Sequence, residues 1–473
     1  MKRTIFIVSL LFILNTNAQN APIAIQNEIQ SNLDVYQQAL QNQGVIVPGW
    51  IVKVEKVGEW QQKFTNGFSN SSMNTQLNGT EKFRIGNITQ TFIGVAFMKL
   101  VQNNTININN SITSYLPINV TTLIPNAATV TVKQLLQHTS GIAGYNDSVI
   151  QDGEPTASEI TVDWYSSNFL NNYSFSTIMN NYFTLYQPVS SPSATIYNYS
   201  ETNYLLLGEI IFNATGLTWQ QYITQNIIIP LNLNNTSCIL DNVTANVPSI
   251  MSGYIPTQDL DGNETLLDAT IQNNSIYKAS RGMISTVDDL NIFWKSVCLG
   301  EIIPLNLTQQ LQTFSAFPDG DTTSFGFGLG CLQVNQGYNW IGNEGVIEGY
   351  TSCVYYLPTL NVYVSVANNS LFSTLPIVAI VENSINQYNL STTNFNTNLI
   401  SIFPNPTSDY FTINSNSSNI FKIAIYDSLG KLIKNYNNIP SQTKVDISEL
   451  EKGIYFLNVK NETLNFNTKI IKS

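Results

Sequence analysis

The alternation of apolar and polar residues changes several times along the 473-residue chain. Residues 26–43 carry apolar side chains at helical spacing, and residues 49–57 alternate as a β-strand does. The middle of the chain has a mainly helical pattern, with three clear segments: 92–102, 131–141 and 204–216. Strand patterns return in residues 324–358, and a last helix is predicted near residues 375–388. This order predicts one α+β domain whose sheet joins both chain ends around a helical insert.

The pattern changes again after residue 388. Residues 389–399 are polar and have no period, which is typical of a linker. Residues 400–473 contain short alternating strands separated by turn residues, and residues 428–430 are predicted to connect a hairpin. We therefore expect a main domain over residues 19–388 and, after the linker, a small all-β sandwich.

The first residues predict export. Lys2 and Arg3 form a positive segment, residues 5–14 an apolar one, and Ala18 offers a small residue for cleavage. This arrangement is that of a signal peptide over residues 1–18. The apolar run is too short to span a bilayer comfortably, and no other long uncharged apolar run follows it. The mature chain is thus predicted to have no transmembrane segment.

Charge and cysteine content narrow the classes of partner. The formal net charge is −11 and no basic cluster is present, which argues against nucleic acid and anionic lipid. The four cysteines are Cys238, Cys298, Cys331 and Cys353. They allow three pairings, among which Cys331 with Cys353 is favoured because both lie in neighbouring strand-like runs. With a single histidine and no phosphate-binding loop, no metal site and no cofactor are predicted.

Residues 81–97 have the pattern of an active-site helix, a polar turn followed by an apolar run. The two positions that should carry chemistry, Asn87 and Gln90, are amides. The only imidazole, His138, ends an apolar helical run, where we expect it to stabilise a turn. A Ser-His-Asp mechanism needs an imidazole base, and no serine elbow motif accompanies this one.

From Val47 to about Tyr388 the chain resembles serine β-lactamases and the related penicillin-binding proteins and esterases, nearest the class C β-lactamase type. Six ordered stretches carry the resemblance: VPGWIV (47–52), KFRIGNITQTF (82–92), VTVKQLLQHTSGI (130–142), YSETNYLLLGEII (199–211), ASRGMISTVDDL (279–290) and GNEGVIEGYTS (342–352). The resemblance implies an antiparallel sheet flanked by helices, with a helical subdomain.

The tail resembles the C-terminal sorting domain of the type IX secretion system of Bacteroidetes. Three stretches carry this resemblance: FPNPTSD (403–409), IYDSLGKLI (425–433) and ISELEKGIYFLNV (447–459). It implies an interaction with the secretion machinery, followed by release or attachment at the cell surface.

The chemistry of the β-lactamase-like family rests on three motifs: Ser-x-x-Lys at a helix start, Tyr-x-Asn, and a strand with Lys-Thr-Gly or His-x-Gly. The corresponding positions here are Asn87 and Gln90, Tyr199 and Glu201, and Asn343, Glu344 and the retained Gly345. An amide nitrogen is a poor nucleophile, and Gln90 cannot accept a proton from it. The cations of the family are replaced and two carboxylates are added, so the pocket is predicted to repel anionic acyl substrates.

Three hypotheses follow from these departures. The first is an exported, non-catalytic protein whose former active site binds a polar, neutral or cationic ligand such as a peptide, a glycan or an amine. The second is a working hydrolase of esters, peptides or β-lactams that uses Tyr199 with Glu201 or Glu344 as base. The third is a regulatory partner of an active relative, with its interface away from the pocket.

Overall fold

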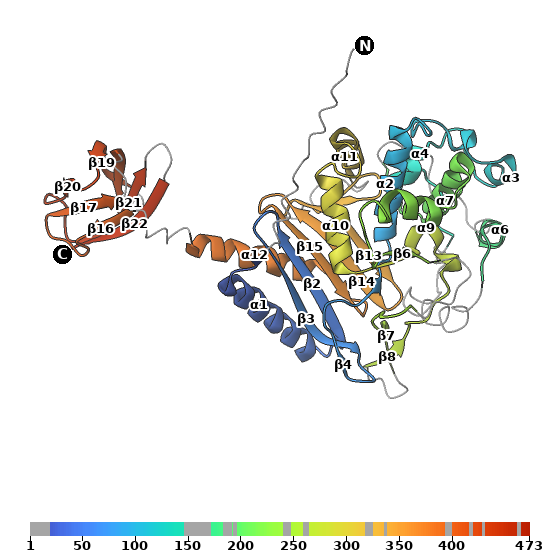
Figure 1. The fold of residues 1–473 in the computed structure, drawn as a ribbon, viewed down its shortest axis with the longest axis horizontal. Helices are drawn as coiled ribbons and strands as arrows, with labels where there is room; N and C mark the ends of the chain where they lie inside the picture. Colours follow the sequence, from blue (N-terminus) through green and yellow to red (C-terminus); the bar gives the residue numbers. More distant parts are fainter. Residues whose placement is uncertain are drawn as a thin grey trace, which may run out of the picture. The chain divides into compact units, whose positions relative to one another are not determined.

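The computed structural model describes residues 19–145, 172–182, 192, 196–239, 247–258, 264–316, 325–334, 338–392, 400–415, 420–427, 431–460 and 465–473. They fall into two compact units, Met1–Glu382 and Asn383–Ser473 (Figure 1). The predicted signal peptide and the predicted hairpin connection at 428–430 lie outside the described residues.

The first unit is built on a mainly antiparallel sheet, 10-stranded over the described residues, with the order β1-β3-β2-β15-β14-β13-β12-β11-β10 and β4 paired with β3. The five long strands are β2 (Gly49–Lys56), β3 (Trp60–Asn70), β13 (Trp340–Ile347), β14 (Tyr350–Leu357) and β15 (Val362–Asn368). The short ones are β1 (Gln19–Asn20), β4 (Thr75–Gln76), β10 (Ser315–Ala316), β11 (Phe325–Phe327) and β12 (Leu332–Val334). Strand β15 pairs antiparallel with β2, with Val366 opposite Val52. The sheet therefore joins both ends of the unit, as predicted.

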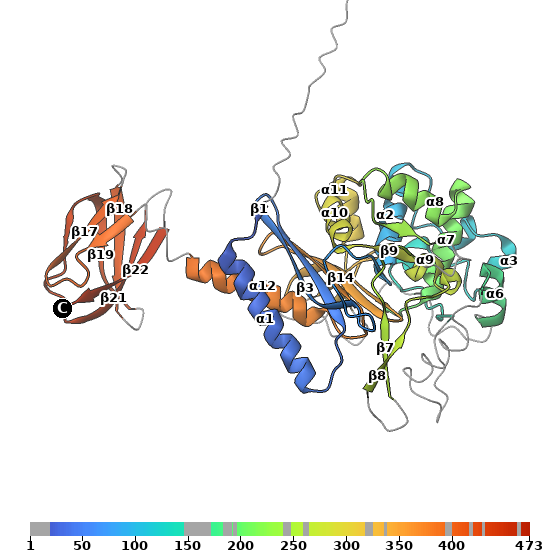
Figure 2. The ribbon, with the colours of Figure 1, turned by 60° about the horizontal axis from the view of Figure 1, so that its bottom comes forward.

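Helices cover both faces of this sheet. Helix α1 (Ile23–Asn42) buries Ile25, Ile29 and Leu33, which lie one turn apart on one stripe. Figure 2 shows α1 and α12 (Leu375–Thr392) on the same side of the sheet, away from α10 (Val287–Cys298). Helix α12 extends into the predicted linker, because its last turn reaches Thr392.

A helical subdomain stands beside the sheet, around α2 (Ile88–Gln102). Its other elements are η1 (Ile112–Ser114), α3 (Ile118–Thr121), α4 (Val132–Leu136), α6 (Phe175–Thr177), η2 (Ile178–Tyr182), α7 (Glu201–Thr215), α8 (Trp219–Ile223), η4 (Thr224–Ile228), η5 (Asn274–Ile276), α9 (Lys278–Arg281) and α11 (Leu305–Leu311). Side chains from Ile88 to Met98 are all buried, so α2 is packed on every side. A Cβ at Gly94 would lie 2.1 Å from the Leu329 carbonyl oxygen, so glycine there allows the 328–332 segment to approach α2.

Two small sheets complete the first unit. One contains β5 (Phe83–Arg84), β9 (Met283–Ser285) and β6 (Ser237–Cys238), and the other β7 (Tyr254–Gln258) and β8 (Glu264–Asp268). Strand β5 leads directly into the start of α2, and its pairing with β9 fixes where that helix begins.

Within the second unit, the described residues from 400 to 473 form an all-β region, as predicted. One sheet contains β16 (Ile400–Phe403), β17 (Tyr410–Ser415) and β20 (Lys444–Asp446). The other contains β19 (Leu432–Pro440), β18 (Ile420–Tyr426), β21 (Gly453–Lys460) and β22 (Asn465–Lys472). Their inner faces share one core, to which Phe411 and Val445 contribute from the first sheet and Ile423 and Leu457 from the second.

The favoured pairing of Cys331 with Cys353 is wrong, because all four cysteines are free. Cys331 directly precedes β12 and Cys353 lies in β14, with β13 between them. Two strand spacings separate such positions by roughly 9–10 Å. A disulfide needs Cα atoms within about 7 Å. In the ranges that the structure describes, each helix is too short or too polar to cross a membrane.

Candidate functional site

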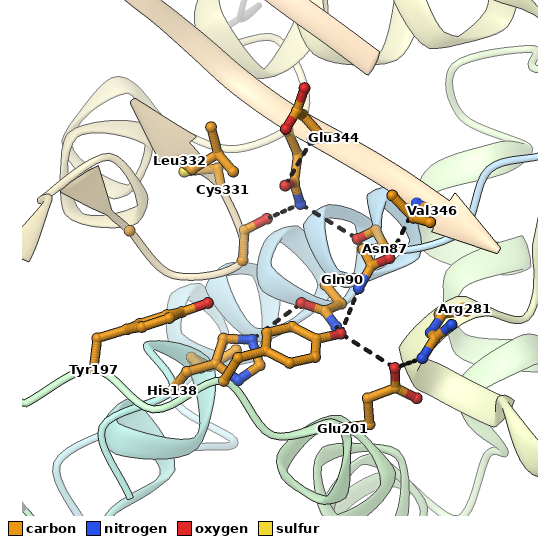
Figure 3. A pocket seen from close by; sticks show the side chains of 15 residues that line it. Asn87, Gln90, His138, Tyr197, Glu201, Arg281, Cys331, Leu332, Glu344 and Val346 are labelled. Carbon is orange, nitrogen blue, oxygen red and sulfur yellow. Dashed lines mark hydrogen bonds and ion pairs between the residues drawn. The ribbon is translucent and has the colours of Figure 1, made fainter. Parts of the chain in front are cut away.

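A pocket of about 350 Å³ opens where α2 begins, between the 328–332 segment, β13 and the start of α7. Six of the positions singled out in the sequence contribute to its lining: Asn87, Gln90, Tyr199, Glu201, Asn343 and Glu344. Figure 3 shows Asn87 and Gln90 from α2 and Glu201 from α7 facing a common space, with Tyr197 and His138 on one side and Arg281 on the other. The remaining position, Gly345, packs behind the site, since a Cβ there would lie 2.0 Å from the Ile85 carbonyl oxygen.

Asn87 is the N-cap residue of α2, but its side chain does not cap the helix. Its Oδ1 accepts a hydrogen bond from the Val346 backbone N–H at 3.2 Å, and its Nδ2 donates to the Tyr199 hydroxyl. A backbone N–H can only donate, so the carboxamide oxygen must face Val346. The orientation of the Asn87 amide is therefore fixed by its partners.

Gln90 lies one turn later in α2, and His138 fixes its orientation. The His138 Nδ1 accepts from the Ser200 backbone N–H at 3.1 Å, so the proton of the neutral ring is on Nε2. That Nε2 lies 3.1 Å from Gln90 Oε1 and donates to it. Burial lowers the pKa of His138 to about 3, so the ring stays neutral at physiological pH. Gln90 Nε2 then donates to the Tyr199 hydroxyl at 3.0 Å and to Ser280 Oγ at 3.1 Å.

His138 has a left-handed backbone, with φ at 56°, directly after the turn that ends α4. Its expected place in a turn agrees with this conformation. The sequence did not predict that its side chain contacts Gln90, because the two residues are far apart along the chain and only the fold brings them together.

Glu201 and Arg281 form an ion pair at the pocket edge. The Glu201 side chain is 1% exposed and that of Arg281 15%. The Tyr199 hydroxyl donates to Glu201 Oε1 at 3.4 Å, and the Tyr145 hydroxyl lies 3.4 Å from Oε2. The expectation that the pocket had lost its cations is therefore wrong. Arg281 lies in the 279–290 stretch, between small and apolar neighbours. A charged residue in such surroundings was the feature of the sequence that could have indicated a buried ion pair.

Asn343 and Glu344 are neighbours on β13 and so point to opposite faces of the sheet. Asn343 Nδ2 faces α2, where it donates to Thr91 Oγ1 at 3.0 Å and to the Gly330 carbonyl at 3.2 Å. The Glu344 carboxylate is on the other face, 3.5 Å from the Thr374 hydroxyl, and Figure 3 shows it turned away from Asn87. Its burial raises the pKa of Glu344 to about 7.

The structure therefore differs from the expectation of two carboxylates inside the pocket. The Glu344 side chain points to the other face of the sheet, and Glu201 is neutralised by Arg281. The two charged side chains that face the pocket, Glu201 and Arg281, therefore balance each other, and the pocket is not negative as expected. In the described ranges, no group of three or more His, Cys, Asp or Glu side chains is arranged to hold a metal ion.

The motif positions satisfy one another's hydrogen-bonding groups. Asn87 and Gln90 both donate to Tyr199, and Tyr199 donates to Glu201. Standard acyl transfer needs a hydroxyl next to a group that can take its proton. The start of α2 offers two amides in those places, and an amide is neither an effective nucleophile nor a base.

Comparisons with known proteins place this geometry in context. A family model described as Beta-lactamase matches residues 38–377, and one described as Secretion system C-terminal sorting domain matches residues 401–473. Protein flp of Staphylococcus aureus is 23% identical over 345 residues, which cover 73% of this chain and 64% of that protein. The chain thus spans slightly less than two thirds of the length of the curated relatives that it matches.

Two solved structures share the fold of the first unit. The D-amino acid amidase from Ochrobactrum anthropi SV3 is 22% identical, with a TM-score of 0.64 over 77% of this chain and 99% of that one. The D-stereospecific amidohydrolase from Streptomyces sp. is 21% identical, with a TM-score of 0.62 over 75% and 96%. At these identities the similarity shows the fold alone.

Proposed function

This chain belongs to the beta-lactamase family, and from that premise we propose that it is an exported member that no longer transfers acyl groups and keeps its pocket to bind a small ligand. Its C-terminal sorting domain directs it through type IX secretion to the outer surface or the medium. The observation that carries the proposal is the pair of amides at the start of α2, Asn87 and Gln90, bonded to Tyr199.

The loss of acyl transfer follows from the chemistry of these side chains. A carboxamide nitrogen shares its lone pair with the carbonyl group, so Asn87 cannot attack an ester or a lactam. In an unrelated serine hydrolase, removal of the nucleophile alone lowers turnover by roughly 10⁶. The Val346 N–H, which lines the pocket, is already bonded to Asn87 Oδ1.

The contacts of the two carboxylates weigh against a rearranged hydrolase. A general base must reach a water molecule beside the substrate. Glu201 is buried in its ion pair with Arg281, and the Glu344 side chain points to the opposite face of the sheet. Neither carboxylate is free to activate water inside the pocket.

The walls of the pocket favour a neutral ligand. Tyr197 and Leu332 supply aromatic and apolar surface, and the ion pair of Glu201 with Arg281 leaves no net charge to attract a cation. A volume of about 350 Å³ is at the small end of ligand pockets. A short neutral peptide segment or a sugar fits this description better than an amine.

The test is hydrolysis of a chromogenic ester and a chromogenic β-lactam by the full mature chain, beside a serine β-lactamase as positive control. We expect no turnover above the buffer rate, and no added mass on the protein after incubation with the β-lactam. The variant Tyr199→Phe is the matched control. Turnover in the native chain that disappears in this variant would refute the proposal and establish a rewired active site around Tyr199.

A further inference from the structure

The Asn87 carboxamide makes both of the hydrogen bonds that a bound amide would make. Its oxygen accepts from the Val346 backbone N–H at 3.2 Å, and its nitrogen donates to the Tyr199 hydroxyl. These partners come from β13 and from the residues just before α7, elements that are distant from α2 along the chain. Val346 and Tyr199 therefore form a receptor for a small polar group, and neither of them belongs to α2, the helix that supplies the Asn87 carboxamide.

The Tyr199 hydroxyl is restricted to accepting from whatever lies beside Val346. A phenol has one proton, and here that proton is donated to Glu201 Oε1 at 3.4 Å. Gln90 Nε2, whose orientation is set by His138, donates to the same oxygen. The Asn87 Nδ2 is the second N–H group that donates to this oxygen.

The receptor is thus selective in its chemistry. It offers one N–H donor, from Val346, and one oxygen acceptor, from Tyr199, and Asn87 spans the two with its carbonyl oxygen and its NH₂ group. A neutral primary carboxamide matches both groups. A carboxylate of the same shape has no proton for Tyr199, and an ammonium has no acceptor for Val346.

We propose that the floor of the pocket is a carboxamide-binding site and that Asn87 occupies it as a ligand supplied by the chain itself. Asn87 is half-buried and Val346 is 50% exposed, so the position is reached from the pocket opening. The inference rests on the proposal that this pocket binds without transferring an acyl group. A ligand bearing a carboxamide binds there when the Asn87 side chain is removed or turned away.

The experiment titrates acetamide into the native chain and into Asn87→Ala, with binding followed by thermal unfolding and by chemical-shift changes. In the variant, acetamide should raise the unfolding temperature saturably in the millimolar range, as its small size dictates. Two net hydrogen bonds correspond to binding about thirtyfold tighter than in the native chain, whose site is filled. Acetate should not reproduce the effect, since it lacks the N–H donors.

Two variants serve as controls. Asn103→Ala removes an exposed asparagine at the other end of α2 and should respond to acetamide as the native chain does. Tyr199→Phe, combined with Asn87→Ala, removes the acceptor and should abolish the saturable response. Asn87→Ser replaces the alanine variant should that one not fold, because serine is favourable at an N-cap.

Equal responses of the native chain and the Asn87 variants would overturn the inference, and so would a response to acetate as strong as that to acetamide. These outcomes are separate from the failure of the proposed function. Turnover of an ester or a β-lactam would refute the non-catalytic role, while the acetamide titration reports only on the receptor formed by Val346 and Tyr199.

Discussion

The ion pair of Glu201 with Arg281 provides a quantitative test of the site, through the variant Arg281→Met. Without the guanidinium, a carboxylate that is 1% exposed keeps the Tyr199 hydroxyl as a donor at 3.4 Å, while the Tyr145 hydroxyl, also at 3.4 Å, donates its one proton to the Ile276 carbonyl. Removing one partner of a buried pair lowers the free energy of unfolding by about 3–5 kcal/mol. For a unit of roughly 360 residues, this corresponds to a fall in the unfolding temperature of roughly 4–7 °C.

Scanning calorimetry at pH 7.5 measures this change, with Lys56→Met as the matched control. Lys56 pairs with Glu59 at 3.1 Å, but the Glu59 side chain is 56% exposed, so breaking this pair should cost less than about 1 kcal/mol. Adding Glu201→Gln to Arg281→Met removes the buried charge and should recover much of the loss. The reasoning is refuted if Arg281→Met is no less stable than Lys56→Met, or if the second substitution makes it worse.

Three further predictions concern pH, export and the thiols. The pKa of His138 is lowered to about 3 and that of Glu344 raised to about 7. Between pH 4.5 and pH 6.5, unfolding therefore adds a proton at His138 and releases one at Glu344. The two groups thus make opposite contributions to the pH dependence of the free energy of unfolding, and these contributions cancel. Glu344→Gln leaves only the His138 contribution. Urea unfolding should therefore show the variant losing about 2 kcal/mol relative to the native chain on acidification through this window, and parallel curves would contradict this. Phe411 is fully buried in the second unit, so Phe411→Ala should lower its free energy of unfolding by about 3–5 kcal/mol. We expect the alanine variant to stay inside the cell and Phe411→Leu to be exported, which cell fractionation measures; equal export of both variants would contradict this. Cys331 and Cys353 are buried and reduced, so iodoacetamide should add mass at these two positions only after denaturation, without prior reduction; a need for reductant would reveal a disulfide.

Much of the fold follows from sequence patterns because its elements have distinct periods. The helix in residues 26–43 and the strands β2, β13 and β14 lie where spacing and alternation indicate. The predicted helix ends before α12 does because residues 389–392 hold a single apolar residue, Leu390, in a polar stretch, and the last turn of a helix needs no apolar period. The pairing of β15 with β2 is a contact between distant segments, which periodicity does not determine.

The site was predictable only at its motif positions. The resemblance located Asn87, Gln90, Tyr199 and Asn343, and the fold brings these residues to one pocket. It did not reveal Arg281, because the partner of a carboxylate 80 positions earlier depends on how α7 and α9 pack together. The face occupied by Glu344 could have been deduced from strand alternation, since Asn343 was expected to face the pocket.

The pairing of β15 with β2 also sets the time at which the first unit can fold during synthesis. Val52 can pair with Val366 only after Val366 has been synthesised, more than 300 residues later. At about 5–20 residues per second, the interval lasts roughly 15–60 s. Throughout it, the apolar stretch from Trp50 to Val52 has no neighbour on its β15 side, and closing so large a loop is entropically costly. The central sheet of the first unit is therefore completed only late in synthesis, once β15 has been made.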